Sequence, residues 1–285
     1  GRLKPDHYGD FARYLVSYVK AMQSAGVGID MLTLQNEPDF EPENYPGMRV
    51  SPLERAAIIR DHLGPMMHRE IPDTYLLDWD HNWDQPDSPI TVLSDAKAAA
   101  YVRGVAWHCY AGDVSAQSMV RDRFPEKESW FTECASGSWS GNWNKSFNWA
   151  VKNLVIGTTR HWARGVVMWN LALDERHGPH LGGCGDCRGL ITINSANGAI
   201  TREPEYYAFA HASRFVPVGA VRIGSEASRP GLESVAFQQG KSGAVTLILL
   251  NGDTADRSVT FAIGQQAFKA QMPSGSVATF VMPGR

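Results

Sequence analysis

The first part of the chain alternates between amphipathic stretches and short apolar runs. Residues 6–24 carry apolar side chains at positions i, i+3 and i+4, the spacing of one face of an α-helix. A capping-box pattern beginning at Ser51 starts a second predicted helix, which extends to about residue 70. The apolar runs that predict strands are residues 31–34, 75–79, 104–107, 129–132 and 165–169, and further helices are expected at 95–102, 115–124, 144–160 and 203–215.

Strands that alternate with helices indicate parallel βα units, which form either an open sheet or a barrel. The pattern changes near residue 218. The remainder has no Trp, Cys or His, and its apolar runs are short and separated by Gly, Asp, Asn and Ser. We therefore expect an α/β domain over residues 1–218 and an antiparallel β-sandwich over 219–285. The predicted sandwich strands are 234–238, 244–250, 258–263 and 277–282.

Charge and composition exclude several classes of protein. The 285 residues include 27 basic and 30 acidic side chains, which gives a net charge of −3. Nucleic-acid binding needs a basic face, so we expect no nucleic-acid partner. No apolar run approaches the roughly 18 residues that a membrane-spanning helix requires, so no transmembrane segment is expected.

Polar side chains follow each predicted strand of the first domain. They include Glu37, Asp80, His108, Glu133 and Asn170. In parallel α/β architectures the active site lies at the carboxyl ends of the strands. Five strands in a row that end in this way point to one site rather than to packing.

Two of these carboxylates, Glu37 and Glu133, suggest a specific chemistry. Cleavage at an acetal carbon needs a proton for the leaving oxygen and a group on the opposite face of the sugar. Two carboxyl groups perform both tasks when their environments separate their pKa values. A lone Glu at the end of an apolar strand, such as Glu133, is unusual without a partner or a function.

Five motifs in order along the chain resemble those of glycoside hydrolase family 30, which includes glucosylceramidases and endo-β-1,6-glucanases. They are residues 33–38 (TLQNEP), 104–110 (GVAWHCY), 130–134 (WFTEC), 169–174 (WNLALD) and 206–217 (YYAFAHASRFVP). The resemblance implies a (β/α)8 TIM barrel followed by an all-β sandwich. The first predicted strand corresponds to the fourth barrel strand of the family, so we expect only about strands 4–8 and interpret the chain as the C-terminal part of a longer enzyme.

The resemblance also implies residue roles. Glu37 would be the general acid/base and Glu133 the nucleophile of a retaining β-glycosidase. Asn36 would bind the 2-hydroxyl of the sugar, Tyr110 would hold Glu133 in place, and Trp169 would stack on the sugar face. Further expected substrate contacts are Asp80, His81, Asn82 and His108, although His108 also fits a supporting role beside the site. Trp79, Trp83 and Trp107 are expected in the core.

The resemblance further implies a β-linked oligosaccharide, polysaccharide or glycolipid substrate, no cofactor and no catalytic metal. We expect a monomer that is secreted, with its signal peptide on the N-terminal part that this chain lacks. Glucosylceramidase-type and endo-β-1,6-glucanase-type activities both fit, and galactanase activity is a less favoured alternative. The alternative from another class is a catalytically incompetent fragment or carbohydrate-binding scaffold, which the intact pair Glu37 and Glu133 disfavours.

One loop departs from the family pattern. His177 and His180 precede Cys184 and Cys187, which form a C-x-x-C motif. A local disulfide, a tetrahedral zinc site and free thiols all fit this spacing, and the disulfide is favoured for a secreted hydrolase. A retaining enzyme needs carboxyl groups about 5–5.5 Å apart, and an inverting one roughly 6.5–9.5 Å. We expect the short separation between Glu37 and Glu133.

Overall fold

The computed structural model describes residues 1–226, 229–241 and 243–284. Residues 227, 228, 242 and 285 of the expected sandwich lie outside the described residues. The chain forms two compact units, neither of them continuous in sequence. The first comprises residues 1–134, 161–169 and 180–184, and the second comprises 135–160, 170–179 and 185–285.

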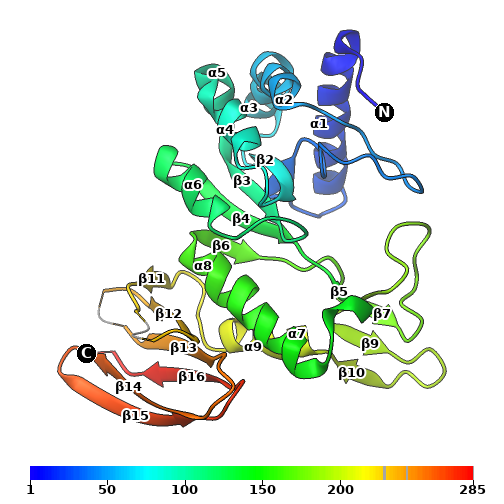
Figure 1. Cartoon of the computed structure of the whole chain (residues 1–285). Helices are drawn as coiled ribbons and strands as arrows, with labels where there is room; N and C mark the ends of the chain where they lie inside the picture. Colours follow the sequence, from blue (N-terminus) through cyan, green and yellow to red (C-terminus); the bar gives the residue numbers. More distant parts are fainter. Residues whose placement is uncertain (227–228, 242, 285) are drawn as a thin grey trace. The chain divides into compact units, whose positions relative to one another are not determined.

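A five-stranded parallel sheet forms the centre of the first unit (Figure 1). Its strands pair in the order β1-β2-β3-β4-β6. Each strand therefore lies beside the next in sequence, as in a barrel, whereas a doubly wound open sheet reverses its order. The strands are β1 (Met31–Thr33), β2 (Tyr75–Asn82), β3 (Val102–His108), β4 (Glu128–Glu133) and β6 (Ala163–Val166).

Helices connect these strands, and three of them, α4, α5 and α6, contact β2, β3 and β4 respectively. The capping box at Ser51 is confirmed, because its hydroxyl accepts from the Glu54 amide and the Glu54 carboxylate accepts from the Ser51 amide. Asp95 caps α5 in a similar way. The helices are α1 (Tyr8–Ser24), α2 (Pro52–Ile58), the π-helical turn η2 (Ile59–Leu63), α3 (Gly64–Glu70), α4 (Asp87–Ser94), α5 (Ala96–Ala99) and α6 (Ala116–Arg123).

The core of the first unit contains the three expected tryptophans. Trp79, Trp83 and Trp107 are at most 4% exposed. A buried ion pair lies among them: the Arg55 Nε donates to Asp78 Oδ1 at 2.9 Å, and both side chains are at most 1% exposed. The Arg55 guanidinium also lies over the ring of Trp79. A buried charge is tolerated only when it is paired and hydrogen-bonded, so this pair fixes the start of α2 against β2.

The second unit combines helices with antiparallel sheets. Strand β13 is buried along its whole length and pairs with β12 and β16 in the four-stranded sheet β11-β12-β13-β16. Phe280 of that sheet packs against Phe261 of the β14-β15 hairpin at 4.6 Å between ring centroids. The antiparallel sandwich is therefore confirmed. Its strands are β11 (Val221–Ile223), β12 (Leu232–Gln238), β13 (Val245–Asn251), β14 (Arg257–Ile263), β15 (Gln266–Met272) and β16 (Val277–Met282).

The rest of the second unit includes an amphipathic helical segment close to the predicted one at 144–160. It comprises α7 (Trp143–Ala150), the π-helical turn η4 (Val151–Gly157) and α8 (Thr158–Arg160). The last helix, α9 (Pro204–Ser213), packs against α7. The small strands of this unit are β5 (Ser136–Gly137), β7 (Ala172–Asp174), β8 (Cys187–Arg188), β9 (Ile191–Ile193) and β10 (Ile200–Arg202).

The strand expected at 165–169 begins and ends earlier, and it shares only residues 165 and 166 with the prediction. Strand β6 begins at Ala163 and ends at Val166. Beyond it, the Val167 amide donates to Phe131 and the Trp169 amide to Cys134, so the chain still follows β4 but without a continuous ladder. Among the described residues, no helix is both long and apolar enough to cross a membrane.

Candidate active site

Four titratable side chains meet at the carboxyl ends of the parallel strands. Glu37 follows β1, Asp80 lies near the end of β2, and His108 and Glu133 are the last residues of β3 and β4. Parallel strands bring their carboxyl ends to one edge of a sheet, so residues separated by up to 96 positions become neighbours. The four side chains form what is called here the carboxylate–histidine cluster.

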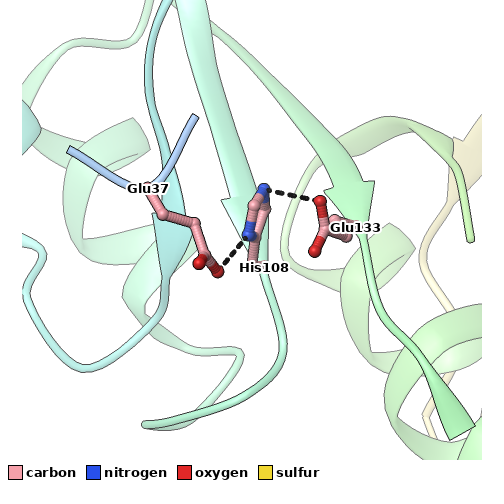
Figure 2. Close-up of side chains that lie close together, drawn as sticks. All are labelled: Glu37, His108 and Glu133. Atoms are coloured by element: carbon pink, nitrogen blue, oxygen red, sulfur yellow. Dashed lines mark hydrogen bonds and ion pairs between the residues drawn. The ribbon is translucent and has the colours of Figure 1, made fainter. Parts of the chain in front are cut away.

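His108 is the centre of this cluster (Figure 2). Its Nδ1 lies 3.1 Å from Glu37 Oε1 and its Nε2 lies 3.0 Å from Asp80 Oδ1. The same Nε2 is 3.9 Å from Glu133 Oε2. The imidazole is fully buried, and it therefore connects the two candidate catalytic carboxylates without contact with solvent.

Asp80 holds the far side of the imidazole. Burial opposes its ionisation, yet hydrogen bonds from His108 and from the hydroxyls of Thr33 and Thr132, at 2.6 and 2.8 Å, hold the pKa of Asp80 below its usual value. Asp80 is thus a fixed negative charge. The three donors occupy both carboxylate oxygens and leave Asp80 little freedom to rotate.

The pKa of His108 responds to this arrangement. Burial alone would lower it, but the hydrogen bonds to Asp80 and Glu37 and the nearby charge of Glu133 raise the pKa of His108 to about 9. His108 is therefore an imidazolium at neutral pH, and both ring nitrogens donate.

Glu133 receives a hydrogen bond from the opposite side. The Tyr110 hydroxyl donates to Glu133 Oε1 at 3.0 Å. Burial raises the pKa of Glu133, while His108 and Tyr110 act to lower it. The pKa of Tyr110 is raised by burial and by the Glu133 charge, so the phenol keeps its proton and stays a donor.

The two candidate catalytic carboxylates are close to each other. Glu37, His108 and Glu133 each offer a ligand-type atom, and these atoms lie within 4.8 Å of one another. Such a trio has the donor atoms of a metal site. Here both His108 nitrogens are already hydrogen-bonded to carboxylates, at 3.1 and 3.0 Å. The arrangement suits proton transfer and charge stabilisation instead.

The backbone of the site is conformationally unusual. Among the described residues, five that are not glycine have positive φ, and three of these are Glu37 (47°), Trp79 (78°) and Asp80 (58°). The β2–β3 register shifts between Trp79 and His81. Left-handed conformations of this kind are unfavourable for side chains with a Cβ and are typical of functional sites. They turn the Asp80 carboxylate toward His108.

The other expected residues surround the cluster to different degrees. The His81 Nε2 is 3.9 Å from Glu37 Oε1 and its Nδ1 has no partner among the described residues. The Asn82 Oδ1 accepts from the Tyr110 amide at 2.9 Å. Asn36 and Trp169 are exposed, and among the described residues no hydrogen bond joins either of them to Glu37 or Glu133. Both line a cavity of about 450 Å³ together with Asp80 and Glu133.

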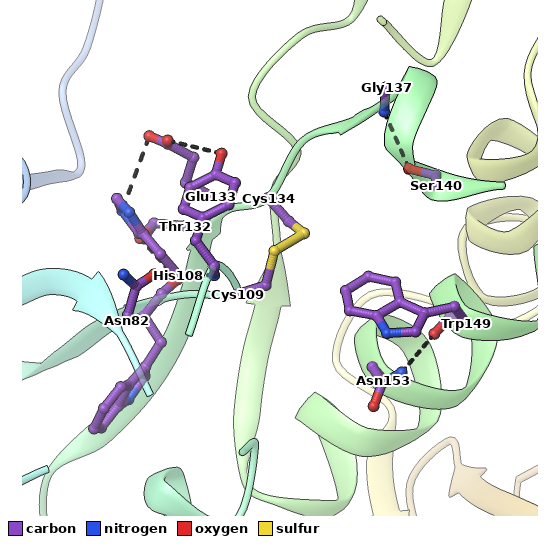
Figure 3. The surroundings of a disulfide bond; sticks show 12 residues. Asn82, His108, Cys109, Thr132, Glu133, Cys134, Gly137, Ser140, Trp149 and Asn153 are labelled. Carbon is purple, nitrogen blue, oxygen red and sulfur yellow. Dashed lines mark hydrogen bonds and ion pairs between the residues drawn. A yellow bond between two sulfur atoms is a disulfide. The ribbon is translucent and has the colours of Figure 1, made fainter. Parts of the chain in front are cut away.

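Sequence reasoning missed four contributors to the site. Thr33 and Thr132 hold Asp80, and the pKa of Tyr45 is raised first by burial and then by Glu37 and Glu133. A disulfide joins Cys109 to Cys134, the residues directly after His108 and Glu133 (Figure 3). Its signal was present in the sequence, since both cysteines follow strand-terminal polar residues on neighbouring strands.

Cys184 and Cys187 are also disulfide-bonded. Neither sulfur is then a thiolate, so neither can act as a zinc ligand or as a free thiol.

The cluster should make stability depend on pH in a predictable direction. The pKa of His108 is raised from 6.5 to about 9, so its contribution is fully present below pH 6.5 and is lost as pH rises through about 9. The shift corresponds to at most about 3 kcal/mol of unfolding free energy. Denaturant titrations between pH 6 and 10 should show that the free energy of unfolding falls more steeply with pH in the wild type than in His108→Gln. The same dependence on pH in both proteins would contradict a raised pKa of His108.

Comparisons with known proteins match both parts of the chain. Residues 1–216 match the glycosyl hydrolase family 30 TIM-barrel domain, and residues 219–280 match the glycosyl hydrolase family 30 beta sandwich domain. The chain is 37% identical to the endo-1,6-β-D-glucanase neg1 of Aspergillus fumigatus over 96% of this chain and 56% of that protein. It is 27% identical to the lysosomal acid glucosylceramidase of Mus musculus over 95% of this chain and 55% of that protein.

A solved structure gives the same result. The endo-β-1,6-glucanase BT3312 superposes with a TM-score of 0.91 at 32% identity, over 99% of this chain and 64% of that one. The chain thus spans little more than half the length of the curated relatives that it matches. The fold is that of a TIM-barrel domain followed by a β-sandwich, and the chain belongs to glycosyl hydrolase family 30.

Proposed function

We propose that the protein is a retaining β-glycosidase that hydrolyses β-1,6-linked glucan. The observation that carries this proposal is the short distance between Glu37 and Glu133, whose carboxylate oxygens approach within 4.8 Å. Retaining enzymes place their carboxyl groups about 5–5.5 Å apart, because the nucleophile attacks the anomeric carbon directly. An inverting enzyme needs a wider gap that admits a water molecule.

The reaction proceeds in two displacements. In the first, Glu37 gives its proton to the glycosidic oxygen as the bond to the anomeric carbon breaks, and a Glu133 oxygen bonds to that carbon. In the second, Glu37 takes a proton from water, whose oxygen attacks the anomeric carbon and displaces Glu133. Two inversions restore the original β-configuration.

The neighbours of the two carboxylates serve these steps. The Tyr110 hydroxyl and the His108 cation stabilise the negative charge of the Glu133 carboxylate before it attacks. They stabilise it again when the second displacement releases the carboxylate. Because His108 contacts Glu37 and Glu133 at once, it keeps their separation fixed. Trp169 and Asn36 line the adjoining cavity, where an exposed indole can stack on a sugar face and an amide can bind a hydroxyl.

The choice of a β-1,6-glucan rests on the relatives. The A. fumigatus protein and BT3312 are named for that activity and share 37% and 32% identity with this chain, whereas the mouse glucosylceramidase shares 27%. We also propose secretion, because cysteines that remain disulfide-bonded are typical of oxidising compartments. The catalytic carboxylates and their hydrogen-bond partners come from one chain, which supports action as a monomer.

A substrate panel on the full-length protein tests this proposal. We expect β-1,6-glucan to yield a ladder of oligosaccharides. NMR should show that each new reducing end is in the β-configuration when it is first formed. β-1,3-glucan, β-1,4-glucan and glucosylceramide should be cleaved far more slowly. Glu126→Gln, an exposed carboxylate outside the site, is the matched control and should retain full activity. If glucosylceramide were cleaved faster than β-1,6-glucan, the proposed substrate would be wrong. If the first product had the α-configuration, the proposed retaining mechanism would be wrong.

A further inference from the structure

The Cys109–Cys134 disulfide lies between the residues that hold the candidate nucleophile. Cys109 stands between His108 and Tyr110, and Cys134 directly follows Glu133 (Figure 3). The Cα atoms of the two cysteines are 5.4 Å apart. The disulfide therefore lies at the point where the donor to Glu133 and Glu133 itself leave their strands.

The backbone ladder ends at this point. Strands β3 and β4 pair regularly up to Trp107 and Phe131, then shift register, and the last pair is His108 with Glu133. Past that pair, no strand hydrogen bonds join the two segments among the described residues. Tyr110 is tied to the neighbouring strand β2 through its amide and Asn82. Two links connect the Tyr110 segment to the end of β4. They are the disulfide of the adjacent Cys109 and the hydrogen bond from the Tyr110 hydroxyl to Glu133.

Cys134 also contacts the segment that carries Trp169. The Cys134 carbonyl accepts from the Trp169 amide at 2.9 Å. Cys134 is fully buried, whereas Cys109 is partly accessible to solvent. The disulfide thus joins the segments that carry Tyr110 and Glu133, and a backbone hydrogen bond from Cys134 connects them to Trp169.

We infer that the Cys109–Cys134 disulfide is a positioning element, which sets the Tyr110 hydroxyl at hydrogen-bond distance from Glu133 and so activates the nucleophile; this inference rests on the proposed role of Glu133. When the link is open, the Tyr110 segment is held only on its β2 side. The hydrogen bond to Glu133 then lengthens, and the carboxylate loses a partner that favours its charged form.

The groups that face Glu133 determine how its titration changes. They are Tyr110, His108, Asp80, Glu37 and Tyr45. Loss of the Tyr110 bond removes a donor that lowers the pKa of Glu133, while burial and the carboxylates Glu37 and Asp80, which raise it, remain. The acidic limb of the activity profile, which reports the ionisation of the nucleophile, should therefore move to higher pH.

The experiment compares the oxidised and reduced full-length protein. A dithiol such as dithiothreitol transfers two electrons and two protons to the disulfide, giving two cysteine thiols, and closes to its own cyclic disulfide. We expect kcat on β-1,6-glucan to fall on the order of tenfold with KM little changed, since small displacements of reacting groups have effects of this size or larger. The midpoint of the acidic limb of the pH–activity profile should move to higher pH by about 0.5–1 unit.

Variants assign the effect to this disulfide and to Tyr110. In the double variant Cys184→Ser/Cys187→Ser, the reductant should still move the acidic limb to higher pH. In Cys109→Ser/Cys134→Ser, the acidic limb should already lie at the higher pH without reductant, and the reductant should not move it further. In Tyr110→Phe the reductant should no longer move the acidic limb, because the donor is already absent. A reductant effect of equal size in Tyr110→Phe, or none in the wild type, would overturn the inference.

Two further measurements separate the possible failures. Circular dichroism should show that reduction leaves the fold intact, and unfolding would mean a general stabilising role instead of positioning. A 13C carboxyl titration of Glu133, assigned with Glu133→Gln, should show a higher pKa in the reduced protein. This readout needs no substrate, so it tests the inference even if the oxidised wild type cleaves no β-glucan, a result that would refute the proposed function alone.

Discussion

Glu133→Ala and Glu133→Gly in the full-length protein should lose turnover by at least about 10⁴-fold, because in the proposed mechanism Glu133 is the group that bonds the anomeric carbon. The loss should appear in kcat for every β-linked substrate, regardless of its leaving group. Neighbouring carboxylates cannot substitute. Asp80 is fixed by three hydrogen bonds, and Glu37 is the proposed proton donor.

Azide provides the decisive measurement for this variant. The truncated side chain leaves room for a small anion on the face where Glu133 stood, and azide attacking from there should yield a glycosyl azide of inverted, α-configuration. Product stereochemistry by NMR identifies the vacated face. If azide restored activity with a β-product, the roles of Glu37 and Glu133 would have to be exchanged.

Glu37→Ala should lower activity on natural glucan by about 10²–10⁴-fold, the usual contribution of a general acid/base. Aryl glycosides with good leaving groups need little protonation, so their first step should be nearly unaffected. The second step should become slow, because water loses its base. We expect a burst of released phenol followed by slow turnover, and azide should accelerate that turnover with a β-configured product.

A matched variant separates this effect from damage to the cluster. Glu37→Gln keeps the size of the side chain and an acceptor for His108, but it has no proton to transfer. Its kinetics should resemble those of Glu37→Ala. A Glu37→Gln variant with normal activity on natural glucan would show that Glu37 only positions His108 and that another group supplies the proton.

Much of the first unit could be predicted from periodicity. The parallel strands are buried apolar runs between helices with recognisable caps, and such signals are local. The weaker strands were not predictable in this way. Strand β10 is exposed at all three positions, and β15 is exposed at five of its seven, so neither has the alternation that marks a half-buried strand. Their pairing partners stabilise them.

The candidate catalytic carboxylates could be located because polar residues at strand ends share one edge. Their supporting network could not. Thr33 and Thr132 are ordinary residues in a strand by composition, and only the fold directs both hydroxyls to Asp80. The raised pKa of His108 likewise depends on carboxylates 28 and 71 positions away, whose distances the sequence does not specify.

The left-handed backbone at Trp79 and Asp80 has a consequence for engineering. Each such residue stores on the order of 1–3 kcal/mol of conformational strain. Glycine at either position would relax that strain. Relaxation at Asp80, however, removes the carboxylate that keeps His108 protonated, and at Trp79 it empties a buried site in the core. Loss of a buried Trp side chain costs about 3–5 kcal/mol, more than the strain that glycine would relieve, so heat resistance alone should select against glycine at Trp79. At Asp80, any stability gained would be obtained at the expense of the candidate site.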